Sequence, residues 1–410
     1  MKLANTNIRY INPLSFQGNI IDSHVHTGKW CNANYDADML DVFIKEPLNV
    51  NIDGVKQTDT VDKMLVSSLS CIDGNGFLNE TDGNIEMLNI CKENPKLYPL
   101  AVCQPGKTNG NSRIIRGLLD LNEGKFIGLK FHPEGLPLIA SDIKYDSYLD
   151  LAKEKGLPCL FHCQDGNSSP EAIYELAKRH PDTPVIMAHL GAGGENNHKR
   201  AIDVLLQSIK KGDAKLYADV SWVDWNYGLP SEKPQDIISV IKELKKENAL
   251  DRLMFGTDAP LGCYGGKPVG NISPKEAYEA TVSNLKTSIK KEFGSEADGI
   301  IQKIFYDNAD ELFFKKNWLN KVAEDVKENS GDITKKASKT KTGALIAGAV
   351  IAFAGIGTFI FSKIKKDKQA QANDNEQINT AQKTVLSKQI QSPAAKINCY
   401  QDINAFIKSV

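Results

Sequence analysis

The sequence predicts an α/β barrel in which eight parallel strands alternate with helices. Two observations support this prediction. Residues 1–318 contain eight short apolar runs rich in β-branched residues, which is typical of parallel strands covered on both faces. Amphipathic helical patterns lie between the later runs. This is the arrangement of a (β/α)8 barrel; an open doubly wound sheet stays open as an alternative, because strand order is not visible in a sequence.

The individual elements can be placed from these runs and from helix-start signals. Ser169 and Pro170 supply one helix with an N-cap and with a proline at its first position. That helix begins at residue 169, and four more are expected at Tyr145–Lys155, Asn197–Lys211, Gln235–Glu247 and Lys275–Phe293. The strand candidates are Asn19–Ser23, Lys63–Ser68, Tyr98–Val102, Phe126–Phe131, Pro158–His162, Pro184–Ala188, Lys215–Ser221 and Arg252–Thr257.

Composition and charge exclude several classes of protein. The 50 Lys and Arg residues nearly cancel the 51 Asp and Glu residues, so we expect no nucleic-acid partner. The eight cysteines are scattered without a C-x-x-C pair, which favours reduced thiols over a disulfide framework or a zinc ribbon. The chain is long enough for one large barrel domain and an appendage, or for two or three smaller domains.

The C-terminal part differs in character from the barrel region. Residues 319–342 are charged and rich in Ser and Thr, which predicts a linker, and residues 363–410 predict a polar and largely disordered tail. Between them, Gly343–Ser362 contains no charge over 20 residues. At about 1.5 Å per residue this stretch matches a bilayer core of roughly 30 Å. We therefore expect a transmembrane helix; a buried core helix would need a domain around it, and both flanks are rich in lysine.

The orientation of this span cannot be read from charge, because lysines lie on both of its sides. The N-terminal residues lack the apolar core of a signal peptide, so we expect a single-pass membrane protein with its barrel on the cytoplasmic side. Ala344, Gly348 and Ala352 recur every four residues and could pair two spans, which leaves a homo-oligomer open.

Four of the seven histidines fall at the carboxyl ends of expected strands. His24 and His26 end the first strand, and their spacing of two places both imidazoles on one face. His162 and His189 end the fifth and sixth strands, and Asp258 follows the eighth. A barrel gathers these ends at one rim, so we expect the five side chains to converge. Nitrogen and carboxylate ligands suit Zn²⁺ and related divalent cations.

The amino-acid sequence around these residues resembles that of a known family. The segments D-S-H-V-H, G-L-K-F-H-P, F-H-C, A-H-L-G and F-G-T-D-A-P are similar to motifs of the amidohydrolase superfamily, and most similar to its amidohydrolase-related (amidohydrolase 2) branch. The segment Ile304–Phe313 also resembles the end of the barrel in that branch, so the resemblance covers roughly residues 18–315. It implies a TIM-type barrel that uses a divalent metal, Zn²⁺ first, to hydrolyse a small-molecule substrate.

The resemblance also implies a role for each residue. His24, His26, His162 and Asp258 would bind the metal, and a bound cation lowers the pKa of its water toward neutrality. Asp258 would take a proton from that water and pass it to the leaving group. His189 would bind a second metal or polarise the substrate. Lys130 would bridge two ions if it were carboxylated; one ion or two is left open, with one favoured.

Two further residues are ambiguous in the sequence. Asp22 could orient a metal ligand through a hydrogen bond or merely cap a turn. His132 lies two residues after Lys130, so both side chains face the same way on the fourth strand.

Several reactions are compatible with this set of residues. The favoured one is hydrolysis of an amide, cyclic amide, lactone or ester. The main alternative is nonoxidative decarboxylation of an unsaturated or aromatic acid, which members of the same branch carry out with the same ligands. A phosphoester hydrolase and a non-catalytic barrel that serves as a tethered binding module are weaker alternatives. Loss of ligands would be expected in a non-catalytic barrel, and here the set is complete.

Overall fold

A computed structural model describes residues 19–30, 33–35, 37–72, 78–107, 110–191, 197–221, 234–260 and 273–316. The expected linker at 319–342, the expected membrane span at 343–362 and the expected tail at 363–410 lie outside these ranges. Among the helices that the structure describes, none is both long enough and apolar enough to cross a membrane.

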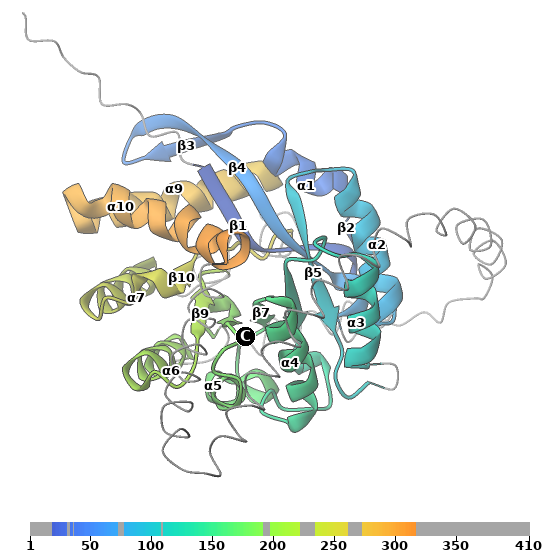
Figure 1. Ribbon diagram of the computed structural model, residues 1–410. Coiled ribbons are helices and arrows are strands. Elements are labelled where there is room, and N and C mark those ends of the chain that lie inside the picture. Colours follow the sequence, from blue (N-terminus) through green and yellow to red (C-terminus); the bar gives the residue numbers. More distant parts are fainter. Residues whose placement is uncertain are drawn as a thin grey trace, which may run out of the picture. The chain divides into compact units, whose positions relative to one another are not determined.

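The strands form one sheet that closes into a barrel (Figure 1). Neighbours pair in parallel along the order β10-β9-β8-β7-β6-β5-β4-β1. The residues after β10 close the ring onto β1, because Val25 pairs with Ala259 and the Ser23 amide donates to the Phe255 carbonyl over 3.0 Å. The strands are β1 (Asn19–Trp30), β2 (Ala33–Tyr35), β3 (Leu48–Ile52), β4 (Val55–Ser68), β5 (Leu97–Cys103), β6 (Gly128–Phe131), β7 (Cys159–Phe161), β8 (Val185–Met187), β9 (Leu216–Asp219) and β10 (Leu253–Met254).

Helices surround the strands on the outside (Figure 1). They are α1 (Ala37–Ile44), α2 (Glu80–Lys92), α3 (Ser112–Leu121), α4 (Asp146–Lys155), α5 (Pro170–Arg179), α6 (Asn197–Lys211), α7 (Pro234–Lys246), α9 (Pro274–Phe293) and α10 (Ala297–Gln302). Short 3-10 turns occur at η1 (Leu69–Cys71), η2 (Pro133–Gly135), η3 (Ile143–Tyr145), η4 (Gly166–Ser168), η5 (Ala188–Leu190), η6 (Leu250–Arg252) and η7 (Gly294–Glu296), and π-helical turns at η8 (Lys303–Asp307) and η9 (Asp310–Lys315).

Successive side chains along each strand point alternately to the outer core, between sheet and helices, and to the interior of the barrel. Phe131 of β6 stacks on Phe161 of β7 with 4.5 Å between ring centroids, and its edge meets Tyr148 of α4. Lys130, which lies between two such outward-facing residues, points instead into the barrel toward β1. The apolar residues therefore hold the helices against the sheet, while polar residues are left for the interior of the barrel.

Two antiparallel strands, β2 and β3, extend the barrel. β3 pairs with the first half of β4, and its backbone binds α9: the amide of Asn49 donates to Glu279 over 2.7 Å, and the amide of Asn51 donates to Ser283 over 3.0 Å. A buried ion pair between Lys286 of α9 and Asp59 of β4, 2.5 Å apart, fixes the same contact. This hairpin is thereby fixed to the outer helical layer (Figure 1).

The last helical turns of the described chain pack against β10 and the residues on either side of it. The Phe255 amide donates to the carbonyl of Ile304 over 2.8 Å, and the Phe255 ring stacks on Phe305 with centroids 4.4 Å apart. The Asn308 side chain donates to the carbonyls of Leu250 and Leu253. The segment Ile304–Phe313 thus anchors β10 from outside, which keeps the loop after β10 in register with β1.

Candidate metal centre

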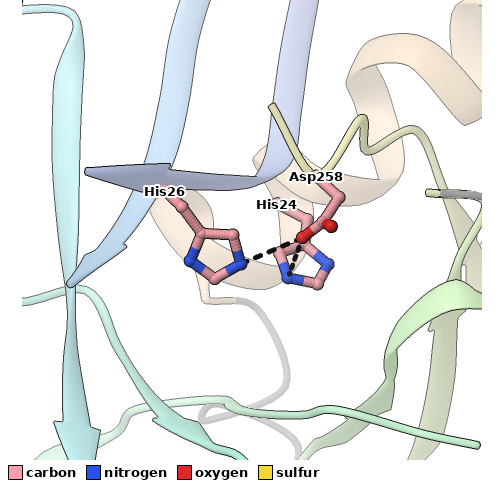
Figure 2. A group of neighbouring side chains, drawn as sticks. All are labelled: His24, His26 and Asp258. Carbon is pink, nitrogen blue, oxygen red and sulfur yellow. Dashed lines mark ion pairs between the residues drawn. The ribbon is translucent and has the colours of Figure 1, made fainter. Parts of the chain in front are cut away.

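Three side chains meet at the carboxyl end of β1. The Nε2 atom of His26 lies 2.9 Å from Oδ1 of Asp258, and the Nε2 atom of His24 lies 3.3 Å from the same oxygen. Figure 2 shows both imidazoles, from β1, turned toward the Asp258 carboxylate from the segment after β10. All three side chains are buried. One ligand atom of each lies within 4.8 Å of the others, which is close enough to share one cation.

A second buried carboxylate, Asp22, holds the Asp258 segment against β1. Its oxygens accept hydrogen bonds from the Thr257 amide over 3.0 Å, the Thr257 hydroxyl over 2.6 Å and the Tyr278 hydroxyl over 2.9 Å. It reaches His24 through that residue's backbone amide, 3.2 Å away. Burial raises the pKa of Asp22 to about 7. Asp22 therefore acts on the position of the backbone around His24 and Asp258, and its contact with His24 is not to the imidazole.

His189 and His162 lie beside this group. The Nε2 atom of His189 is 3.2 Å from Nδ1 of His162, and the His189 ring stacks on His24 with centroids 4.8 Å apart. The other nitrogen of His162, Nε2, contacts Oε1 of Gln164 at 3.0 Å. The structure thus brings both histidines into the cluster, but places His162 next to His189 and not with the His24–His26–Asp258 group. Their expected roles stay predictions.

Lys130 is buried within the same cluster. Its Nζ atom lies 2.7 Å from His24 Nε2, the nitrogen that faces Asp258. Burial lowers the pKa of this lysine to about 8, although Asp258 and Asp219 favour its charged form. One lone pair on His24 Nε2 can accept from Lys130 or bind a cation, but cannot do both. Metal binding at His24 therefore requires Lys130 to turn its amine away.

His132 extends the row of imidazoles. Its ring stacks on His162 with centroids 4.1 Å apart and an interplanar angle of 25°. Burial and the neighbouring His162 and Lys130 hold the pKa of His132 well below its usual value. Its Nδ1 atom is buried and has no hydrogen-bond partner among the described residues.

Sequence reasoning missed two hydrogen-bond partners of the imidazoles, Asp219 and Ser67. Asp219, the last residue of β9, lies with Oδ2 3.1 Å from Nδ1 of His24. Ser67 of β4 lies with its hydroxyl 2.9 Å from Nδ1 of His26. Asp219 also belongs to a second group, with His24 and His189, whose ligand atoms are mutually close. The only available signal for Asp219 was an acid at the end of an expected strand, which is also a common turn residue.

The protonation states of the first group suit a divalent cation. Burial lowers the pKa of His26 to about 4, so this imidazole is neutral at pH 7. Burial would raise the pKa of Asp258, but its hydrogen bond with His26 and the positive charge that nearby imidazoles carry at acidic pH hold that pKa well below its ordinary value. Neutral imidazole and ionised carboxylate are the forms that bind Zn²⁺. Two nitrogens and one oxygen match the three protein ligands of a catalytic zinc site, so these residues fit the metal.

A comparison with protein families agrees with this geometry. The family model described as amidohydrolase matches residues 88–315, more than half of the chain. The chain belongs to the amidohydrolase family. The matched range contains four of the residues that the sequence singled out, Lys130, His162, His189 and Asp258. The H-x-H segment of this amidohydrolase lies before the matched range, on β1.

The solved structure of a bacterial amidohydrolase supports the same fold. An amidohydrolase from Burkholderia multivorans, with HEPES bound, is 12% identical over 72% of this chain and 99% of its own, with a TM-score of 0.52. A probable 2-pyrone-4,6-dicarboxylic acid hydrolase from Acinetobacter baumannii is 16% identical over 72% of this chain and 99% of its own, with a TM-score of 0.48. A 2,6-dihydroxybenzoate decarboxylase from Rhizobium is 13% identical over 72% and 98%, with a TM-score of 0.45. No curated protein matches this amidohydrolase.

Proposed function

We propose that this amidohydrolase is a metal-dependent hydrolase that uses an activated water on an amide, cyclic amide, lactone or ester. The observation that carries the proposal is the convergence of His24 Nε2, His26 Nε2 and one oxygen of Asp258 within 4.8 Å. When bound there, a divalent cation such as Zn²⁺ supplies a water nucleophile at neutral pH and polarises the substrate carbonyl.

The surrounding residues would handle protons and charge. Asp258 is ionised, as its lowered pKa requires, and its carboxylate can accept a proton from the attacking water and return it to the leaving group. His189 lies next to this group on the side of His162, where the lone pair of its Nε2 atom can bind a second cation, or can take up a proton and then polarise the attacked oxygen. The partly exposed ring of His162, which stacks on His132, gives the substrate a surface at this side.

The metal content of the purified 410-residue chain tests the centre. We expect about one equivalent of divalent metal, with two as the upper limit if Lys130 bridges a pair of ions. His26→Gln should lose this metal. His180→Gln is the matched control, because His180 lies outside the cluster against Asp146, 3.0 Å away. Wild-type protein that is folded yet free of metal after reconstitution would contradict the assignment.

Turnover assays separate hydrolysis from the alternative reaction. A panel of lactones, cyclic amides and esters should be hydrolysed by the wild-type protein, while Asp258→Asn should stay folded and lose turnover. Unsaturated and aromatic carboxylic acids belong in the same panel. Release of CO₂ from one of them, without hydrolysis of any ester or amide, would replace the hydrolase with a decarboxylase.

We also propose that residues 343–362 anchor the protein to a membrane, with the barrel on the cytoplasmic side. The uncharged 20-residue stretch between lysine-rich flanks supports this proposal. Deletion of 343–362 should move the protein into the soluble fraction after ultracentrifugation. Deletion of 371–390, a segment of equal length in the polar tail, is the control and should leave it with the membranes. Sedimentation that survives the first deletion refutes the anchor.

A further inference from the structure

Asp219 contacts two of the cluster's histidines from behind. It is fully buried at the end of β9. Its Oδ2 atom accepts from Nδ1 of His24 over 3.1 Å. Its Oδ1 atom accepts from the backbone amide of His189 over 3.0 Å, and from both the amide and the hydroxyl of Ser221. One carboxylate therefore reaches both β1 and the turn that follows β8.

These contacts decide between two roles for Asp219. Its carboxylate is close enough to His24 and His189 to serve as a metal ligand. However, three donors already converge on Oδ1, and Oδ2 faces a ring nitrogen of His24. We propose that Asp219, together with Ser221, is a positioning residue that fixes the tautomers of His24 and His189 and is not a ligand of the metal.

The direction of each hydrogen bond follows from the acceptor. An ionised carboxylate can only accept, so the proton between Asp219 and His24 lies on Nδ1 of His24. That choice leaves the lone pair on His24 Nε2. This lone pair accepts from Lys130, whose Nζ atom at 2.7 Å is nearer than the Asp258 oxygen at 3.3 Å. A histidine ligand whose second nitrogen donates to a carboxylate is held in the ring orientation and tautomer that metal binding needs.

The Ser221 hydroxyl, which lies between Asp219 and His189, determines the tautomer of His189 in the same way. The Ser221 hydroxyl gives its proton to Asp219, so its oxygen accepts from Nδ1 of His189, 2.8 Å away. The lone pair of His189 is then on Nε2, which lies toward His162. Asp219 thus sets which nitrogen of each imidazole carries the lone pair, in His24 directly and in His189 through a hydroxyl.

Asp219 also holds the backbone that carries His189. His189 has φ of 59° and Leu190 has φ of 47°, both in the left-handed region that side chains other than glycine disfavour. The hydrogen bond from the His189 amide to Asp219 secures this turn. Without it, the position of the His189 ring over His24 would no longer be fixed.

Asp219→Asn makes a specific prediction because of the donors on Oδ1. The amide oxygen must take that position, since an NH₂ group there would face the Ser221 and His189 amides. The NH₂ group then lies beside Nδ1 of His24 and donates to it, which moves the imidazole proton to Nε2. Because Nε2 is the proposed metal-binding atom, the variant should carry the wrong tautomer for binding.

The inference rests on the proposed metal centre, and two measurements keep their failures apart. Nitrogen chemical shifts of ¹⁵N-histidine-labelled, metal-free protein report each tautomer without any metal. Zn²⁺ titration against a chromophoric chelator reports affinity and stoichiometry. For Asp219→Asn we expect the His24 proton on Nε2, with affinity about 10- to 100-fold lower at unchanged stoichiometry. Asp213→Asn is the matched control, because Asp213 lies just before β9 and binds Tyr174 outside the cluster.

Each other outcome has a defined meaning. Loss of one metal equivalent in Asp219→Asn makes Asp219 a ligand and overturns the inference, as does a folded variant with unchanged tautomer and affinity. A wild-type protein that binds no Zn²⁺ refutes the metal centre, while the tautomer measurement still decides the role of Asp219. If Asp219→Asn fails to fold, Ser221→Ala decides. In Ser221→Ala the proton of His189 should no longer be confined to Nδ1, whereas Ser221→Thr, which keeps the hydroxyl, should hold it there.

Discussion

Glu80 offers a test of how burial and hydrogen bonding compete at the edge of the barrel. It is the first residue of α2 and is 1% exposed. Its carboxylate accepts from the Gln104 amide over 2.6 Å, the Asn111 amide over 3.1 Å and the Tyr148 hydroxyl over 3.1 Å. Because Gln104 follows β5 and Asn111 caps α3, this one side chain holds both ends of the β5–α3 connection.

The pKa of Glu80 gives the size of its contribution to the free energy of unfolding. Burial raises the pKa of Glu80 from 4.5 to about 7, although its three hydrogen bonds favour the charged form. Between these two values the folded protein keeps a proton that the unfolded chain has lost. The stability contributed by Glu80 is therefore full below pH 4.5, and it declines as pH rises to about 7, by about 3 kcal/mol in total.

Urea unfolding of the wild-type protein and of Glu80→Gln at pH 5 and pH 8 measures this effect. The difference in free energy of unfolding between the two proteins should change by about 2 to 3 kcal/mol in favour of the wild type at pH 5. Glu86→Gln, on the same helix, controls for the loss of one negative charge from α2. Parallel pH profiles for wild type and Glu80→Gln would refute the reasoning. A difference that instead grows with pH would show that the three donors outweigh burial.

Three further predictions concern single residues. Lys130→Gln should retain about one equivalent of metal per chain, since two imidazoles and a carboxylate suffice; a fall from two equivalents to one would show that Lys130 bridges two ions. Lys286→Met leaves Asp59 buried without its partner and should lower the free energy of unfolding by about 3 to 5 kcal/mol. A loss no larger than that from breaking an exposed ion pair would contradict this reasoning. Gly28→Ala, at φ of 94° and with its new Cβ 2.6 Å from the Ser70 hydroxyl, should cost about 1 kcal/mol or more in thermal unfolding.

The barrel strands were predictable because burial on both faces leaves a simple pattern. All eight expected runs overlap a strand of the barrel, and Pro170 begins its helix as expected, with Ser169 as the cap. The family expected from the motifs is confirmed by the match over residues 88–315. The hairpin of β3 and β4 was not predicted. Its exposed positions carry Asn49 and Asn51 of β3 and Lys56 and Thr58 of β4, and the buried face of β4 is interrupted by the charged Asp59, so β4 was expected to begin at Lys63 and begins at Val55.

The site was predictable only where strand ends carry a distinctive residue. His24, His26 and Asp258 come together as expected, because a parallel barrel places all its carboxyl ends at one rim. The position of His162 beside His189 depends on ring orientation, which strand spacing does not determine. The metal number, the substrate and the membrane anchor stay predictions.

Asp219 shows why the second layer of such a site is harder to infer than the first. A metal ligand is constrained by the few residue types that can bind the ion, so a histidine at a strand end already carries information. A residue that fixes a tautomer needs only a donor or an acceptor at hydrogen-bond distance from a ring nitrogen, and Ser67 meets that need at His26 as Asp219 does at His24. Many residue types and main-chain groups can supply such a partner. Its identity is therefore set by which strands are neighbours in space, and β9 reaches β1 only through the closed barrel.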